Sequence, residues 1–138
     1  MLLTKLLTGV LKAIKVDYVV EERAWALGYE EFRYRIWKSG ISEFWYRIDR
    51  PNGVSTKVWV SPIYYNDYNT WSNVFSNAKS GLFNSTPMVS VTSCNNQFLS
   101  FIPQGITKDG IGILRPISVG TKSNLAHSFT IYAIGTWK

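Results

Sequence analysis

Residues 32–48 read FRYRIWKSGISEFWYRI, and this stretch decides the fold class. Aromatic or apolar residues alternate with basic ones over residues 32–37, which is the period of a strand with one face in water. Residues 38–40 (Lys-Ser-Gly) are a turn signal, and residues 41–48 return as a second apolar arm. The segment therefore predicts a β-hairpin.

The chain after residue 16 continues in the same manner, because Val, Ile, Thr, Tyr and Trp favour strands and turn residues separate the runs. Residues 61–87 are expected to form a long connection with some local order. The last apolar run, residues 127–137, is apolar on both faces, which favours a strand in the centre of a sheet. The sequence predicts a mainly β fold, an antiparallel β-sandwich over residues 17–138. The strand candidates are 18–22, 32–37, 41–48, 54–60, 88–93, 98–102, 111–117 and 127–137. An irregular stretch is expected from residue 23 through Gly28, and a turn at residues 50–53.

The N-terminal segment, residues 1–16, has a different pattern and is predicted to be a helical stem. Leu3, Leu7, Val10 and Ile14 are spaced by four, three and four residues, the seam of a short coiled coil. A helix of this length is marginal alone in water, so its apolar stripe must be covered. It either packs on its own domain or forms a parallel bundle with further copies of the chain. We favour the bundle.

Composition and charge exclude several classes of protein. The chain has 138 residues, 15% aromatic and 17% charged, which excludes disorder. Lys and Arg number 15 against 9 Asp and Glu, but in the first fifty residues the two signs are interleaved. A nucleic-acid-binding protein would show a basic stripe, so we expect this chain to bind no nucleic acid. No run approaches the roughly 20 apolar residues of a membrane span, so no membrane insertion is expected.

Groups that could perform chemistry are sparse. Cys94 and His127 are the only residues of their kinds, which leaves no intrachain disulfide and no thiolate metal cluster. We expect Cys94 to be a small buried apolar residue and His127 a packing or surface residue. After residue 50 the only acids are Asp67 and Asp109, and nothing marks them as the facing pair that a glycosidase needs. We expect no catalysis, no metal and no cofactor.

The segment 63–71 is the most suggestive polar and aromatic stretch. It reads IYYNDYNTW, three Tyr and one Trp among Asn, Asp and Thr. Aromatic faces stack on the C–H patches of sugars, and rigid rings cost little entropy to order. The alternative is that these rings pack the loop onto the domain or fill a subunit interface. The candidate glycan contacts are Tyr64, Tyr65, Asp67, Tyr68 and Trp71.

Three segments resemble tail proteins of phages that infect Gram-positive bacteria. Residues 32–45 (FRYRIWKSGISEFW) are similar to a pattern of aromatic-x-Tyr-Arg-x-Trp, Ser-Gly, then Glu-Cys-Trp, with Phe44 in place of the usual Cys. Residues 23–30 also depart from the usual Gly/Ser-rich form. Residues 83–89 (FNSTPMV) and 133–138 (AIGTWK) look like parts of tail-fibre head domains.

The resemblance implies a trimeric β-sandwich head on a fibre or coiled-coil stem, with Trp37, Trp45 and Trp137 in the core or an interface. It implies binding of a host-surface receptor, often a glycan. We therefore expect a homotrimeric receptor-binding tip domain of the virion, synthesised in the bacterial cytoplasm, with a host cell-surface glycan and other tail or baseplate proteins as partners. The alternatives are a trimerisation or baseplate-attachment module without a ligand and a small glycan-degrading enzyme.

Overall fold

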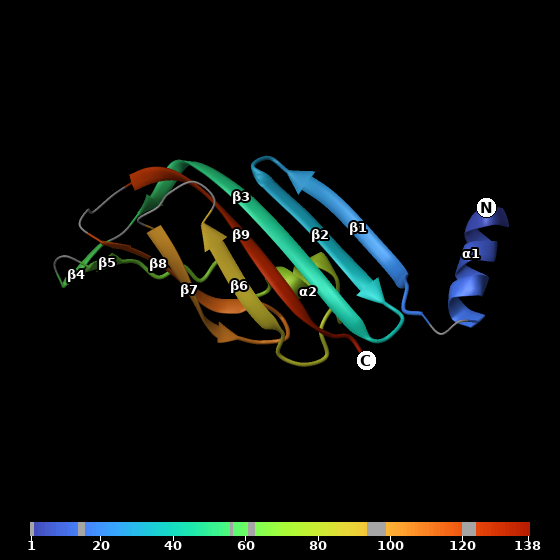
Figure 1. Cartoon of the computed structure of the whole chain (residues 1–138). Coiled ribbons are helices and arrows are strands. Elements are labelled where there is room, and N and C mark those ends of the chain that lie inside the picture. The colour runs from blue at the N-terminus through green and yellow to red at the C-terminus, as the bar shows by residue number, and fades with distance from the viewer. Residues whose placement is uncertain (1, 14–15, 56, 61–62, 94–98, 120–123) are drawn as a thin grey trace.

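The described part of the chain is mainly β and forms two antiparallel sheets and two helices, as a computed structural model shows (Figure 1). The structure describes residues 2–13, 16–55, 57–60, 63–93, 99–119 and 124–138. The elements are α1 (Leu2–Ala13), β1 (Val19–Leu27), β2 (Glu30–Trp37), β3 (Ile41–Ser55), β4 (Lys57–Val60), β5 (Ile63–Tyr65), α2 (Val74–Ala78), β6 (Met88–Ser93), β7 (Leu99–Ile106), β8 (Ile111–Val119) and β9 (Asn124–Thr136).

The larger sheet has the strand order β1-β2-β3-β9-β6. Strands β2 and β3 form the hairpin that the alternation predicted, with Phe32 opposite Tyr46 and Ile36 opposite Ser42. Gly40 takes a φ of 106° in the connecting turn, a conformation that side chains with a Cβ rarely adopt. The prediction of a hairpin is confirmed.

Strand β9 lies between β3 and β6, so the prediction of a central final strand is also confirmed. Phe129, Ile131 and Ala133 are buried on its inner side, while Tyr132 and Ile134 are half-buried on the outer side. A strand with neighbours on both edges and side chains covered on both faces is expected to be apolar throughout.

The smaller sheet has the strand order β4-β5-β8-β7, and side chains of this sheet and of α2 contact the inner side of the larger sheet. Phe101 of β7 contacts Phe129 of β9, with ring centroids 4.5 Å apart. Phe75 of α2 meets Phe44 of β3 edge to face at 5.2 Å. These four rings belong to one hydrophobic core.

Three predicted irregular segments are more ordered than expected. Strand β1 continues through residues 23–27, because Trp25 packs on its cross-strand neighbour Phe32. The predicted turn at residues 50–53 is instead a register irregularity within β3. The predicted connection at 61–87 contains β5 and α2. Local turn residues did not end these elements, since pairing with distant strands outweighs weak local preferences.

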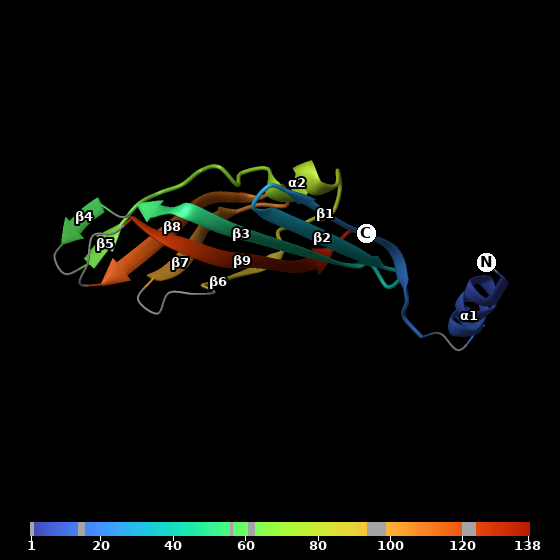
Figure 2. The ribbon, with the colours of Figure 1, turned by 90° about the horizontal axis from the view of Figure 1, so that it is seen from above.

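Helix α1 lies beyond the end of the sheets in both views (Figures 1 and 2). Leu3, Leu7 and Val10 are 70%, 55% and 49% exposed, so within one chain the helix does not bury its apolar stripe on its own domain. The fourth seam residue, Ile14, lies outside the described residues, as does Cys94. Among the described residues, no helix is long and apolar enough to cross a membrane.

Candidate functional site

The predicted glycan contacts do not form one open site. Tyr64 and Tyr65 lie in β5 and are half-buried. Arg115 of β8 lies over the Tyr65 ring, 4.7 Å from its centroid, and its Nε donates to Asp67 at 2.7 Å. This hydrogen bond from the Arg115 guanidinium holds the pKa of Asp67 below its usual value. Asp67 is therefore already bound by a cation of its own chain.

Tyr68 and Trp71 join the same segment to the core. The backbone N–H groups of Tyr68 and Leu114 donate to each other's carbonyl oxygens at 3.0 and 2.8 Å. Trp71 is only 5% exposed and packs edge to face on Phe129, with ring centroids 5.6 Å apart. Of the two interpretations of residues 63–71, these contacts correspond to packing of the segment onto the domain.

A cavity of ≈ 300 Å³ lies between the inner face of strands β1–β3 and residues 70–78, a segment that contains α2. Trp71 forms part of its wall. Its volume is at the lower end of the range of small-molecule sites. Four aromatic residues from four places in the chain line it: Trp25, Phe32, Tyr46 and Trp71. Trp71 is therefore the one predicted contact residue that belongs to this cavity.

The aromatic wall follows from strand register. Trp25 pairs directly with Phe32, and Phe32 pairs directly with Tyr46, so the three side chains stand in a row across β1, β2 and β3. The Trp25 and Phe32 rings stack at 5.2 Å with an interplanar angle of 6°, and Phe32 and Tyr46 lie 5.0 Å apart. Directly opposed residues of antiparallel strands are close enough for such contacts.

Three polar side chains line the same cavity: Glu30, Thr70 and Asn77. Glu30 is half-buried, and its Oε1 accepts a hydrogen bond of 2.9 Å from the Tyr46 hydroxyl. Thr70 and Asn77 are exposed and come from the opposite wall. Aromatic surface with a few fixed polar groups is the usual composition of a site for a small organic ligand.

Helix α2 is too short to be stable alone, and contacts from elsewhere hold it over the cavity. The Phe75 and Ser76 N–H groups donate to the Asp109 carbonyl oxygen at 2.9 and 3.1 Å. Lys79, just after the helix, lies 3.1 Å from Glu21 of β1. The Lys79 hydrogen bond, together with one from Tyr34, lowers the pKa of Glu21. Both the β7–β8 turn and the edge strand therefore position this wall.

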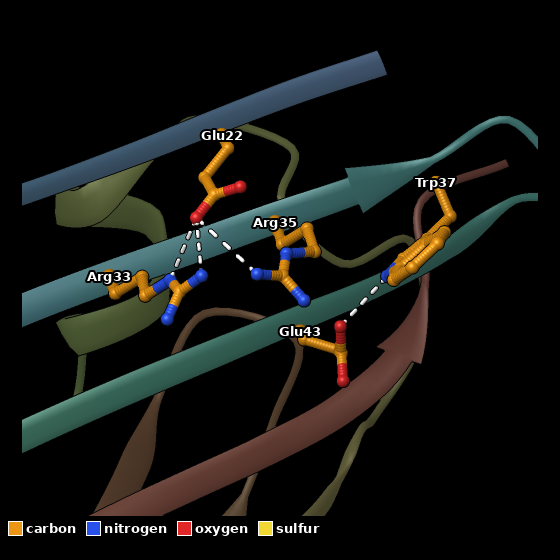
Figure 3. A network of polar contacts seen from close by, with 5 residues as sticks. All are labelled: Glu22, Arg33, Arg35, Trp37 and Glu43. Atoms are coloured by element: carbon orange, nitrogen blue, oxygen red, sulfur yellow. Dashed lines mark hydrogen bonds and ion pairs between the residues drawn. The ribbon is translucent and has the colours of Figure 1, made fainter. Parts of the chain in front are cut away.

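The outer face of the same sheet carries a different arrangement, a network of paired charges (Figure 3). Arg33 and Arg35 of β2 both turn toward the Glu22 carboxylate of β1, with Arg33 Nε at 2.9 Å and an Arg35 terminal nitrogen at 3.4 Å. The hydrogen bond from Arg33 is the main reason that the pKa of Glu22 is lowered. Trp37 Nε1 donates to Glu43 at 2.8 Å.

Trp45 of β3 lies among these cations. The guanidinium carbons of Arg33 and Arg35 are 5.3 and 5.7 Å from its ring centroid, and Tyr132 packs beside it at 5.4 Å. Cation–π and ion-pair contacts therefore already occupy the main groups of the outer face. The inner cavity is the better candidate for ligand binding.

The remaining groups to consider in the described part of the chain are candidate metal ligands and His127. No group of three His, Cys, Asp or Glu residues there could hold a metal ion. His127 lies in β9, and its backbone is opposite Arg50 of β3. No family model, curated protein or solved structure matches this chain.

Sequence reasoning missed most of the cavity, namely Trp25, Glu30, Phe32, Tyr46 and Asn77. One signal was available, because residues 24–32 read AWALGYEEF, with apolar residues on both sides of Gly28. Gly28 takes a φ of 59°, as expected in a tight turn between paired strands. Recognising this second hairpin would have placed Trp25 beside Phe32.

Proposed function

We propose that this chain is a non-catalytic adhesion module that binds a saccharide of a host cell surface in the cavity between β1–β3 and α2. The observation that carries the proposal is the aromatic lining of this cavity with few fixed polar groups. The resemblance of residues 32–45, 83–89 and 133–138 to phage tail-fibre heads points to the same class of function.

Binding follows from the two kinds of group in the cavity. The apolar C–H patches of a pyranose ring pack on Trp25 and Phe32, and burial of this surface supplies most of the affinity. The hydroxyl groups of the sugar exchange hydrogen bonds with Glu30, Thr70 and Asn77, which fix its orientation. Among the described residues that line the cavity, Glu30 is the only acid, whereas glycoside hydrolysis normally uses two. Binding without hydrolysis is therefore favoured over a glycan-degrading enzyme.

The same proposal includes a homotrimer. The two sheets would form a β-sandwich head, and three copies of α1 would form a short coiled-coil stem that covers Leu3, Leu7 and Val10. Such a trimer presents three cavities at once, and multivalency makes a weak single site effective at a cell surface. In a virion, the stem end would join the head to other tail or baseplate proteins.

The cavity is tested with a glycan array that compares the wild type, Trp25→Ala and Trp45→Ala. The two variants remove the same type of side chain from opposite faces of one sheet, since Trp25 lines the cavity and Trp45 lies in the outer network. We expect Trp25→Ala to lose most of the signal and Trp45→Ala to retain it. Equal signals from all three proteins would remove the cavity from consideration.

A purely structural trimerisation module is the second candidate, favoured by the exposed apolar stripe of α1. Sedimentation equilibrium of Leu7→Ser with Val10→Ser tests the stem, and Lys5→Ser with Lys12→Ser, two positions outside the heptad seam in the sequence, is the control. We expect a monomer from the first pair and a trimer from the second. A wild-type trimer that binds no cells and no glycans would favour the structural module, and a monomeric wild type would exclude both trimer proposals.

A further inference from the structure

The charge on the described lining of the cavity is negative. Among the described residues that line it, Glu30 is the only charged one. Glu30 as a residue is half-buried, and its carboxylate accepts one hydrogen bond, from Tyr46. Within the described part of the chain, Glu30 forms no ion pair, whereas Glu21, Glu22 and Asp67 each have a cationic partner.

Two cations close to the cavity wall have partners other than Glu30. The Arg23 guanidinium lies over the Trp25 ring, 4.6 Å from its centroid. Lys79 is held by Glu21 at 3.1 Å. Neither side chain lines the cavity, and neither forms an ion pair with Glu30 in the described structure.

A carboxylate drawn into a partly desolvated cavity is unfavourable unless it is paired or well hydrogen-bonded. One hydrogen bond from Tyr46 orients it and leaves further acceptor positions on its two oxygens. A ligand ammonium group would occupy these positions with charge-assisted hydrogen bonds, which are about twice as strong as neutral ones. A ligand carboxylate or phosphate at the same place would be repelled.

We propose that the cavity selects a saccharide with a free, protonated amine, and that the ammonium group binds at Glu30 beside the Trp25–Phe32 wall. The inference rests on the proposed function, because it names the ligand class of the same cavity. The net charge of +6 attracts the whole chain to an anionic surface over long distances, whereas Glu30 acts only on the group in contact with it.

Three sugars of one shape and different charge test the selection: glucosamine, glucose and glucuronate. Their affinities for the full chain are measured by ligand-observed NMR titration. We expect glucosamine to bind roughly tenfold more tightly than glucose, a difference of about 1.4 kcal/mol, because a charge-assisted hydrogen bond is stronger than a neutral one. Glucuronate should bind most weakly, and added salt should reduce the difference between the three sugars.

Two variants distinguish the effect of the cavity carboxylate on affinity from the effect of the net charge of the chain. Glu30→Gln keeps the side-chain shape and provides an amide oxygen that accepts from the Tyr46 hydroxyl. This variant should have equal affinities for glucosamine and glucose. Glu31→Gln removes the neighbouring carboxylate, which is exposed and lies on the opposite face of β2, and it should keep the preference.

Two results would overturn the inference in distinguishable ways. Equal binding of the three sugars by the wild type, or a preference that survives Glu30→Gln, would refute the role of Glu30 and leave saccharide binding intact. Binding of none of the sugars, together with a blank glycan array, would refute saccharide binding and the inference together.

Discussion

Gly110 is the position at which the support of the cavity wall can be tested most directly. It is buried in the turn between β7 and β8, against the segment that carries Trp71. A Cβ atom at this position would lie 2.4 Å from the carbonyl oxygens of both Trp71 and Ser72. Side-chain carbons do not approach other atoms within 3.0 Å, so in Gly110→Ala the two backbones must separate by at least 0.6 Å.

The cost of this separation can be worked out from the contacts that it strains. Inserting a methyl group into a packed region costs about 1–3 kcal/mol. The Ile111 N–H donates to the Trp71 carbonyl at 2.8 Å, and the Phe75 N–H donates to the Asp109 carbonyl at 2.9 Å. Weakening them adds up to about 1 kcal/mol each. We expect Gly110→Ala to lower the free energy of unfolding by roughly 3 kcal/mol, which corresponds to about 10 °C in Tm.

The assay is urea unfolding, monitored by tryptophan fluorescence. The protein concentration is kept fixed, because oligomerisation makes apparent stability concentration-dependent. Gly9→Ala in α1 is the matched control, since a Cβ there meets nothing within 4 Å. Saccharide binding should fall together with stability, because Trp71 lines the cavity. If Gly110→Ala unfolds within about 0.5 kcal/mol of the wild type, the close approach of the β7–β8 turn to Trp71 is refuted.

Three further predictions concern the core and the dependence on pH. Phe129→Ala should lower the free energy of unfolding by about 3–5 kcal/mol, measured by urea unfolding, because it removes the ring that joins β9 to the smaller sheet. Ser42→Ala should cost about 1–3 kcal/mol in the same assay, because the buried Leu82 carbonyl loses its 2.7 Å hydrogen bond; no change would mean that another donor replaces it. The pKa of Glu21 is below its ordinary 4.5 in the folded chain, so the stabilisation that it contributes is complete above that pH and is lost as the pH falls through the lowered value. Lys79→Met should make the loss of stability on acidification shallower, and an unchanged pH profile would contradict this assignment.

The β2–β3 hairpin was predictable because its signals are local. Alternation of side chains has the period of a strand, and Gly40 marks the turn between the arms. The apolar character of residues 127–137 likewise predicted the central position of β9, because a strand with two neighbours is covered on both faces. Both features depend on residues that are close together in the sequence.

The candidate site could not be predicted in the same way. Trp71 lies among tyrosines and asparagines in the sequence, as a loop residue for recognition would, yet its ring packs on Phe129 of a distant strand. Trp25 was expected in an irregular segment, and its partner Phe32 is found only when the register of β1 and β2 is known. Exposure of a side chain depends on what covers it, which local sequence does not encode.

The sequence by itself determined the β character of the chain, the central place of its last strand and the apolar stripe of α1, because each follows from the period of neighbouring side chains. Only the tertiary structure decided that Trp71 is buried and that Trp25, Phe32, Tyr46 and Glu30 meet at one cavity. These side chains come from separate elements, and their distances are set by strand register and by the contacts that hold α2. An aromatic residue has the same identity in a core, an interface or a binding site, and its surroundings alone distinguish the three.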